Sequence, residues 1–103
     1  MRNMSISLPA KGLGVQSAVN VTDASTTIIA ANSPRNYLLI QNNSDTDIYL
    51  NLTGSAASTS DGSSFKIASA GGSLEIKTWV GTGAITAIHA SAGNTKVLTV
   101  LEG

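Results

Sequence analysis

The stretch from Arg35 to Leu52 constrains the fold of this chain most strongly, because it sets two apolar segments on either side of a short polar one. The first segment is a dense apolar run at residues 37–40, and the second places Ile48, Leu50 and Leu52 at alternate positions. Alternation with a period of two is typical of a strand that buries one face. Two such runs around a polar loop predict an antiparallel hairpin.

The loop length of this hairpin decides which side chains share a face, since side chains alternate along a strand. An odd loop, which we favour, sets Leu50 opposite Ile40, whereas a four-residue loop brings Leu39 to that face instead. The odd loop also gathers three residues on the other face: Gln41, Tyr49 and Asn51. With either loop the first strand is apolar on both sides, because Tyr37 and Leu39 alternate with Leu38 and Ile40. Strands of this kind are central in a sheet or are covered by another layer.

Short β-branched or alternating runs recur along the rest of the chain. Residues 19–22 and 26–31 predict two strands, and Asn32-Ser33-Pro34 ends the second because proline lacks a backbone donor. A further short strand is predicted at Met4–Leu8. Gly71-Gly72 can adopt the positive φ angles of a tight turn, which predicts a hairpin of residues 65–69 with 73–80.

The last predicted hairpin joins residues 84–90 to 96–101 through a turn at Gly93-Asn94, with His89 opposite Leu98. No stretch has a helical period. Seven or eight short strands at even spacing are typical of an all-β protein. We therefore predict a small antiparallel, jelly-roll-like β-sandwich at residues 19–103, preceded by an extended N-terminal arm at residues 1–18.

The composition narrows the classes of partner. Net charge is zero, from six basic and six acidic residues, so we expect no nucleic-acid partner, which would require a basic patch. Charged residues make up 12% of the chain, and Ser, Thr, Asn and Gly together number 43. Such a surface is cheap to desolvate, which favours contact with other proteins, but the same composition fits a plain polar β-domain equally well. Neither a signal peptide nor a membrane span is evident, so we expect synthesis in a cytoplasm and no membrane partner.

Few residues offer chemistry. The chain lacks cysteine, and its single histidine, His89, lies in a predicted strand with no identifiable nucleophile or acid partner. Asp45 and Asp47 form a D-x-D pair that Asp61 could supplement, but calcium needs six or more oxygen ligands. We therefore predict no enzyme activity, no catalytic residue, no metal site and no cofactor. Asp45 is instead expected to cap a turn, and Asp47 to begin a strand.

Aromatic and aliphatic side chains on outward faces are the best candidates for an interface. Trp79 falls on the alternate face from Leu74 and Ile76, so it is expected to point away from the core. Exposed aromatic groups mark protein interfaces or sugar-stacking platforms. The predicted interface residues are Tyr37, Leu39, Tyr49 and Trp79.

The segments RNYLLIQNNSDTDIYLNL, LEIKTW and GAITAIHASAGNTKVLTVLEG, within residues 35–103, resemble small β-rich virion proteins of tailed bacteriophages. The resemblance implies a capsid decoration or cement protein, which binds the major capsid protein on the virion surface, commonly as a homotrimer, and stabilises the shell. Residues 1–34 show no such resemblance. The alternative function is a carbohydrate- or receptor-binding module of a phage tail or fibre.

Overall fold

The computed structural model describes residues 14–77 and 82–103 of the chain. These residues form eight β-strands and no helix, which confirms the all-β prediction. In the described part of the chain, accordingly, no helix is long and apolar enough to cross a membrane. The strands are β1 (Val15–Val21), β2 (Thr26–Ile29), β3 (Leu38–Asn42), β4 (Ile48–Asn51), β5 (Phe65–Ile67), β6 (Gly72–Ile76), β7 (Ile85–His89) and β8 (Lys96–Glu102).

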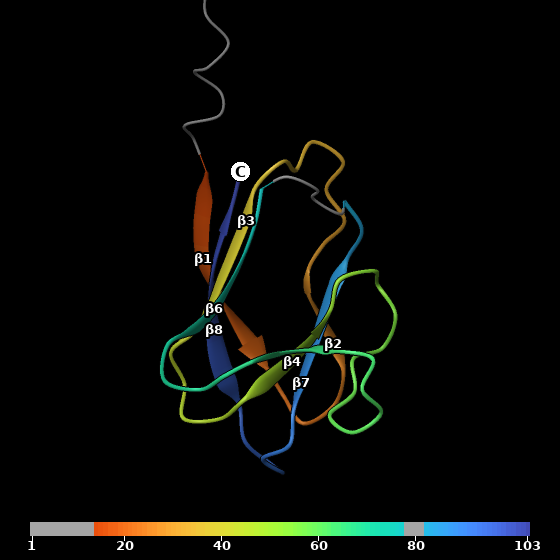
Figure 1. Cartoon of the computed structure of the whole chain (residues 1–103), viewed down its shortest axis with the longest axis vertical. Helices are drawn as coiled ribbons and strands as arrows, with labels where there is room; N and C mark the ends of the chain where they lie inside the picture. The colour runs from red at the N-terminus through yellow and green to blue at the C-terminus, as the bar shows by residue number, and fades with distance from the viewer. Residues whose placement is uncertain (1–13, 78–81) are drawn as a thin grey trace, which may run out of the picture.

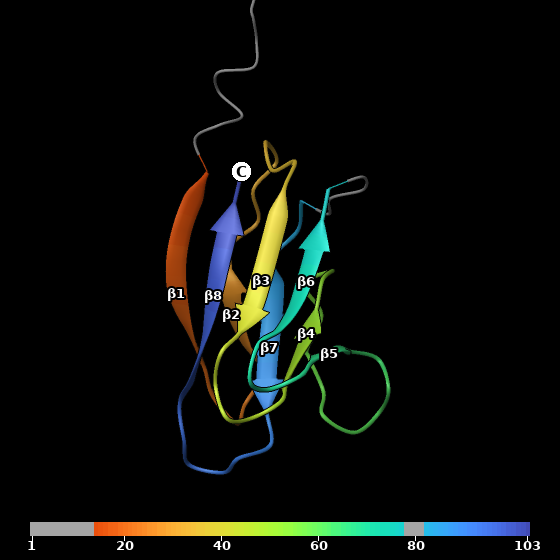
Figure 2. The same cartoon turned by 60° about the vertical axis from the view of Figure 1, so that its left-hand side comes forward.

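The eight strands form two four-stranded antiparallel sheets that pack face to face, sheet A on the left and sheet B on the right of Figure 1. Sheet A has the order β1-β8-β3-β6 and stands in front in Figure 2, while sheet B has the order β2-β7-β4-β5. The chain alternates between the sheets at every connection except the one between β4 and β5. The predicted β-sandwich is thereby confirmed.

The strand pairing describes one long ribbon that has been rolled up. β1 pairs with β8, β2 with β7, β3 with β6 and β4 with β5, so the ribbon folds back on itself between β4 and β5. Two further ladders, β3 with β8 and β4 with β7, close the roll into two sheets. This is the arrangement of an eight-stranded jelly roll.

The inward faces of both sheets meet in one hydrophobic core, because alternate residues of each strand are apolar. Two of its members, Leu38 and Ile40, lie on β3, which is a central strand as its apolar faces predicted. Leu39 between them points outward. The core residues are Val21, Ile29, Leu38, Ile40, Ile48, Leu50, Ile67, Ile85, Ala87, Leu98 and Val100.

The predicted hairpin of the Arg35–Leu52 stretch is wrong, because β3 lies in sheet A and β4 in sheet B. Ile40 and Leu50 both enter the core, but from opposite sheets. The sides of the two strands that face away from the core therefore point in opposite directions. Gln41 lies on the outside of sheet A, while Tyr49 and Asn51 lie on the outside of sheet B, so these three residues do not share a face.

The other two predicted hairpins are wrong for the same reason. Turns form near both predicted positions, with φ angles of +110° at Gly71 and +77° at Gly93, but each one carries the chain from one sheet to the other. The first turn lies at Ala70-Gly71 and not at Gly71-Gly72, because Gly72 already begins β6. His89 consequently lies opposite Ile48, and Leu98 lies opposite Val19. An apolar alternation looks identical whether its strand lies beside its neighbour or across the core from it.

The start of the sandwich also differs from the prediction. β1 begins at Val15, so residues 15–18 belong to sheet A and not to an arm. The rest of the predicted arm, residues 1–13, lies outside the described residues together with the strand expected at Met4–Leu8.

Buried polar side chains lie at both ends of β3. At the first, Arg35 donates from Nε to Glu102 Oε2 over 2.6 Å, from Nη1 to Gly83 O over 3.1 Å and from Nη2 to Ala30 O over 2.9 Å. Glu102 belongs to sheet A, whereas Ala30 follows a strand of sheet B and Gly83 precedes one. The guanidinium therefore ties the two sheets together.

Asn42 also joins the two sheets, at the other end of β3, where its side chain is fully buried. Nδ2 donates to Thr46 O over 2.8 Å and to Ile67 O over 2.9 Å. Oδ1 accepts hydrogen bonds from the amide nitrogen of Ser44 over 3.0 Å and from its hydroxyl over 2.6 Å. Every polar atom of this buried amide is paired, which is the condition for placing one in a core.

Candidate binding face

His89 is buried, and both of its ring nitrogens contact backbone groups. Nδ1 accepts a hydrogen bond from the amide nitrogen of Ser91 over 3.0 Å. Nε2 lies 3.1 Å from Val21 O and 2.9 Å from Asn94 O, so it carries the proton. The ring thus fastens the β7–β8 connection to the end of β1, and neither nitrogen is left to act on a substrate.

The three aspartates considered as calcium ligands are engaged separately. Asp45 lies 2.8 Å from Lys96, whose hydrogen bond lowers the pKa of that carboxyl. Asp47 accepts from the amide nitrogen of Ser69 over 2.8 Å, where it ties the start of β4 to the β5–β6 turn. Asp61 accepts from Ser63 within its own loop. Among the described residues, no three metal-ligating side chains of the His, Cys, Asp or Glu type come together.

The outside of sheet B is partly covered by the chain itself. Thr86 points outward from β7 and is nevertheless buried, because its hydroxyl donates to Ser55 O over 2.6 Å in the β4–β5 connection. In the same connection Ala57 is buried and its amide nitrogen donates to the Ser25 hydroxyl over 2.9 Å. The small side chains of residues 54–64 allow this close approach.

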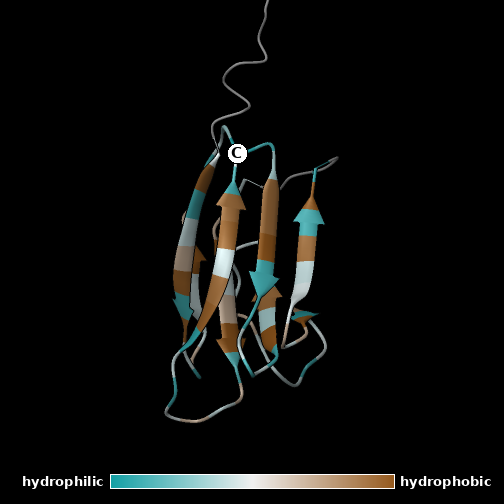
Figure 3. Cartoon of the chain, turned by 90° about the vertical axis from the view of Figure 1, so that its left-hand side faces the viewer, coloured by the Kyte–Doolittle hydropathy of each residue, from teal (hydrophilic) through white to brown (hydrophobic). Residues whose placement is uncertain are grey.

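Within residues 14–77 and 82–103, no segment crosses the outside of sheet A, which we call the outer face of sheet A. The strand registers place its side chains in two rows that run across all four strands. Figure 3 shows this sheet from outside, with hydrophobic colour along much of the central strands β8 and β3. One row is Gln16, Leu101, Leu39 and Glu75, and the other is Ala18, Thr99, Gln41 and Ser73.

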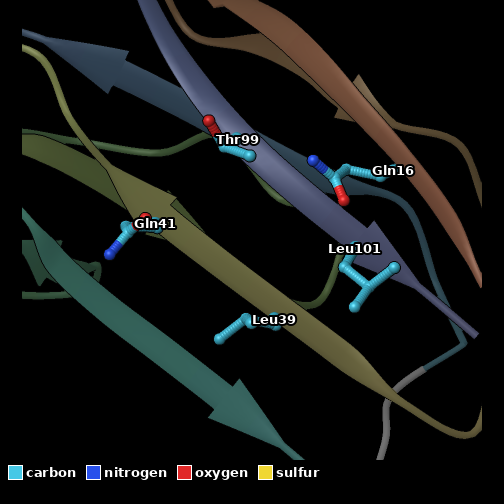
Figure 4. Close-up of a pocket in the computed structure, with 5 residues that line it drawn as sticks. All are labelled: Gln16, Leu39, Gln41, Thr99 and Leu101. Atoms are coloured by element: carbon cyan, nitrogen blue, oxygen red, sulfur yellow. The ribbon is translucent and has the colours of Figure 1, made fainter.

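A shallow hollow of about 190 Å³ lies where these two rows meet (Figure 4). Leu39 and Leu101 supply its apolar surface, and Gln16, Gln41 and Thr99 supply amide and hydroxyl groups. Neither the Gln16 amide nor the Thr99 hydroxyl bonds another of the described residues, so both can bond a partner. The hollow is lined without a single charged group, which keeps its desolvation cost low.

Tyr37 and Glu75 form the rim of the outer face of sheet A. The Tyr37 hydroxyl donates to Glu75 Oε2 over 2.7 Å. This hydrogen bond, together with partial desolvation, raises the pKa of Tyr37 above its usual value of 10.0. A polar rim around an uncharged centre is the usual anatomy of a protein interface.

The predicted interface residues fall on different parts of the molecule. Leu39 lines the hollow and Tyr37 lies at its rim, so the structure brings these two together. Tyr49 lies on the outside of sheet B, on the opposite side of the sandwich. Trp79 lies outside the described residues.

Sequence reasoning missed four of the five residues that line the hollow: Gln16, Gln41, Thr99 and Leu101. A signal for Leu101 was available in the last strand, since Val97 and Leu101 alternate with Leu98 and Val100. That strand, like β3, is apolar on both faces, which marks it as central. No such signal marks Gln16, because residues 1–18 show no sustained periodicity and therefore predict an arm.

Comparison of the chain with protein-family models, with curated proteins and with solved structures finds no match.

Proposed function

We propose that this chain is a structural virion protein that binds the assembled capsid of a tailed bacteriophage and stabilises the shell. The surface that binds is the outer face of sheet A, and the major capsid protein is the partner. The observation that carries the proposal is this open face, with its uncharged hollow between Leu39 and Leu101.

Three features support a binding role at this face. The central strands β3 and β8 present apolar side chains outward, and exposed apolar groups on a sheet favour contact with a partner. The buried clamps at Arg35 and Asn42 hold both ends of β3, so the face is rigid before it binds. Jelly rolls recur in viral capsid proteins, which agrees with the sequence resemblance but does not by itself assign a function.

Leu101→Glu tests the proposal, because it places one charge in the middle of the hollow. On shells assembled from the major capsid protein of the phage that carries this sequence, wild-type protein is expected to co-sediment and to raise the thermal transition of the shell. The variant is expected to bind at least about a hundredfold more weakly, since an unpaired charge would be buried.

Ser63→Glu is the matched control, because it adds the same charge to an exposed loop residue on the other side of the molecule. It should bind like wild type. Circular dichroism of each variant establishes that it is folded. The proposal fails if wild-type protein neither binds nor stabilises the shell, or if folded Leu101→Glu protein binds as well as wild type.

The hollow also favours a second candidate function, carbohydrate binding on a tail or fibre. Its free amide and hydroxyl groups at Gln16 and Thr99 are the kind that bond sugar hydroxyls. Stacking on a sugar ring would need an aromatic side chain, and Tyr37, the aromatic residue nearest in the described part of sheet A, is bonded to Glu75. A glycan array separates the two functions: binding that is lost in Gln16→Ala favours the lectin role, and a blank array removes it.

A further inference from the structure

The four edge strands of the sandwich differ in how well they are protected against pairing with another chain. Natural edge strands are usually short, charged or bulged, because an unpaired edge is a template for a further strand. β2 has a register irregularity between Thr27 and Ile29. β5 has three residues and contains Lys66, and β6 contains Glu75.

β1 has none of these protections. It is seven residues long, its sequence VQSAVNV contains neither a charge nor a proline, and its register with β8 is continuous. Within the described residues, no strand pairs with its other edge. Of the four described edges, β1 is therefore the one built to accept another strand.

The inner side of β1 is also uncovered along its first half. Val15 and Ser17 share the inward direction with Val19 and Val21, yet both are exposed, and Val15 is 65% exposed. β2, the edge strand of sheet B, has only four residues and does not extend beneath them. An added strand next to β1 would bring apolar contacts to this overhang.

The sequence of β1 is close to a palindrome, which identifies the strand that fits beside it. When two copies of VQSAVNV pair antiparallel around Ala18, Val15 lies opposite Val21 and Gln16 lies opposite Asn20. On the inner side Val15 then meets Val21 and Ser17 meets Val19, while the amides meet on the outer side. No like charges oppose one another, and cross-strand pairs of this kind stabilise a sheet.

We infer that the protein forms a symmetric dimer in which β1 pairs antiparallel with β1 of a second copy, centred on Ala18. The two copies of sheet A then form one continuous eight-stranded sheet. A two-fold axis perpendicular to that sheet gives an isologous contact, which closes after two subunits.

The dimer changes the binding face described above. Gln16 lines the hollow of one subunit, and its neighbour across the new seam is Asn20 of the second copy. Both outer faces point the same way, so two hollows lie on one surface and can engage a repeating lattice together, which raises avidity. The inference holds whether or not that lattice is a capsid.

Charge substitution in β1 tests the dimer on the full-length protein, by light scattering after size exclusion at increasing concentration. Wild-type protein is expected at twice its monomer mass of 10.4 kDa. Gln16→Lys/Asn20→Lys and Gln16→Glu/Asn20→Glu variants each place two like-charge pairs across the seam. Each should dimerise at least about tenfold more weakly, and an equimolar mixture of the two should recover the dimer.

Two controls make the test specific to the seam. Ser73→Lys/Ala92→Lys adds the same charge at exposed positions away from β1 and should dimerise like wild type. Because the chain has no cysteine, Ala18→Cys should form an intersubunit disulfide on oxidation, whereas Ser73→Cys should not. A wild-type monomer or trimer, unchanged dimerisation of both double variants, or failure of Ala18→Cys to cross-link would each overturn the inference.

Discussion

Arg35 shows how one side chain can decide the stability of this sandwich. Its side chain has no exposed surface, while the carboxylate of Glu102 beside it keeps 21% of its own. A buried guanidinium is tolerated only when its charge is paired and its donors are bonded. Glu102 pairs the charge of Arg35, and the carbonyl groups of Ala30 and Gly83 accept its other hydrogen bonds. The burial of the guanidinium therefore depends on these three groups.

Arg35→Met is expected to destabilise the protein by about 3 kcal/mol, because it leaves the carboxylate and two carbonyl groups without their donor. Chemical denaturation of wild type and variant measures the loss. Arg35→Lys should recover only part of it, since an ammonium cannot reproduce the planar fork of donors.

Lys66→Met is the control for Arg35, because it removes a charge from an exposed pair. Lys66 Nζ lies 3.9 Å from Asp47, and its side chain is 55% exposed. Exposed pairs contribute little to stability, so this variant should unfold like wild type. An equal loss in both variants would show that the Arg35 clamp has no special role.

At the scale of elements, the turn from β5 to β6 is packed closely against its own backbone. Its chain reverses through Ala70 and Gly71, both with positive φ, and the Gly72 amide nitrogen donates to Ala68 O over 3.1 Å. A Cβ on Gly72 would lie 2.7 Å from Ala68 N and closer still to Ala68 O. Only glycine fits there, because the obstacle is backbone and cannot move aside.

Gly72→Ala is therefore expected to destabilise the protein by about 1–3 kcal/mol, the usual cost of forcing extra atoms into a packed site. Hydrogen exchange should show the loss first in β6, next to the displaced turn. Gly93→Asn is the control, since Gly93 has φ +77° with nothing within 4 Å, and asparagine tolerates this conformation. A loss from Gly93→Asn as large as that from Gly72→Ala would refute this explanation.

The elements could be predicted from the sequence, but their neighbours could not. Period-two alternation and the turns at Asn32-Ser33-Pro34, Gly71-Gly72 and Gly93-Asn94 located the strands, because these signals act over a few residues. Sheet membership depends on contacts between residues far apart in the chain, such as Ile48 with His89. The outer face of sheet A was indicated only by strands with apolar residues on both sides, through Leu39 in β3 and Leu101 in β8.

For the molecule as a whole, the rolled ribbon brings the two ends of the described chain together. Val15 lies opposite Glu102 in the β1–β8 ladder, and the backbone of Gly103 lies beside Gly14. Nearly every ladder joins residues that are distant in sequence, which slows folding since long loops must close before contacts form.

Joining Gly103 to Met1 in a cyclic backbone should therefore stabilise the protein by about 2–4 kcal/mol and accelerate its folding, because the link restricts the unfolded chain. Stopped-flow refolding and equilibrium denaturation measure the two effects. The linear protein carrying the same ligation residues is the control. A cyclic protein that folds more slowly, or is less stable, would contradict an effect of the proximity of Gly14 and Gly103.

The pairing of β1 with β8 has a consequence for synthesis on the ribosome. β1 is the first described strand to leave the exit tunnel and β8 is the last of them, so sheet A cannot be completed before β8 has emerged. Until then β3 and β1 both lack β8, which is the strand that β1 pairs with in sheet A. Nascent chains on one polysome therefore expose the uncharged VQSAVNV edge to each other, and early subunit pairing and chaperone demand should both rise with translation density.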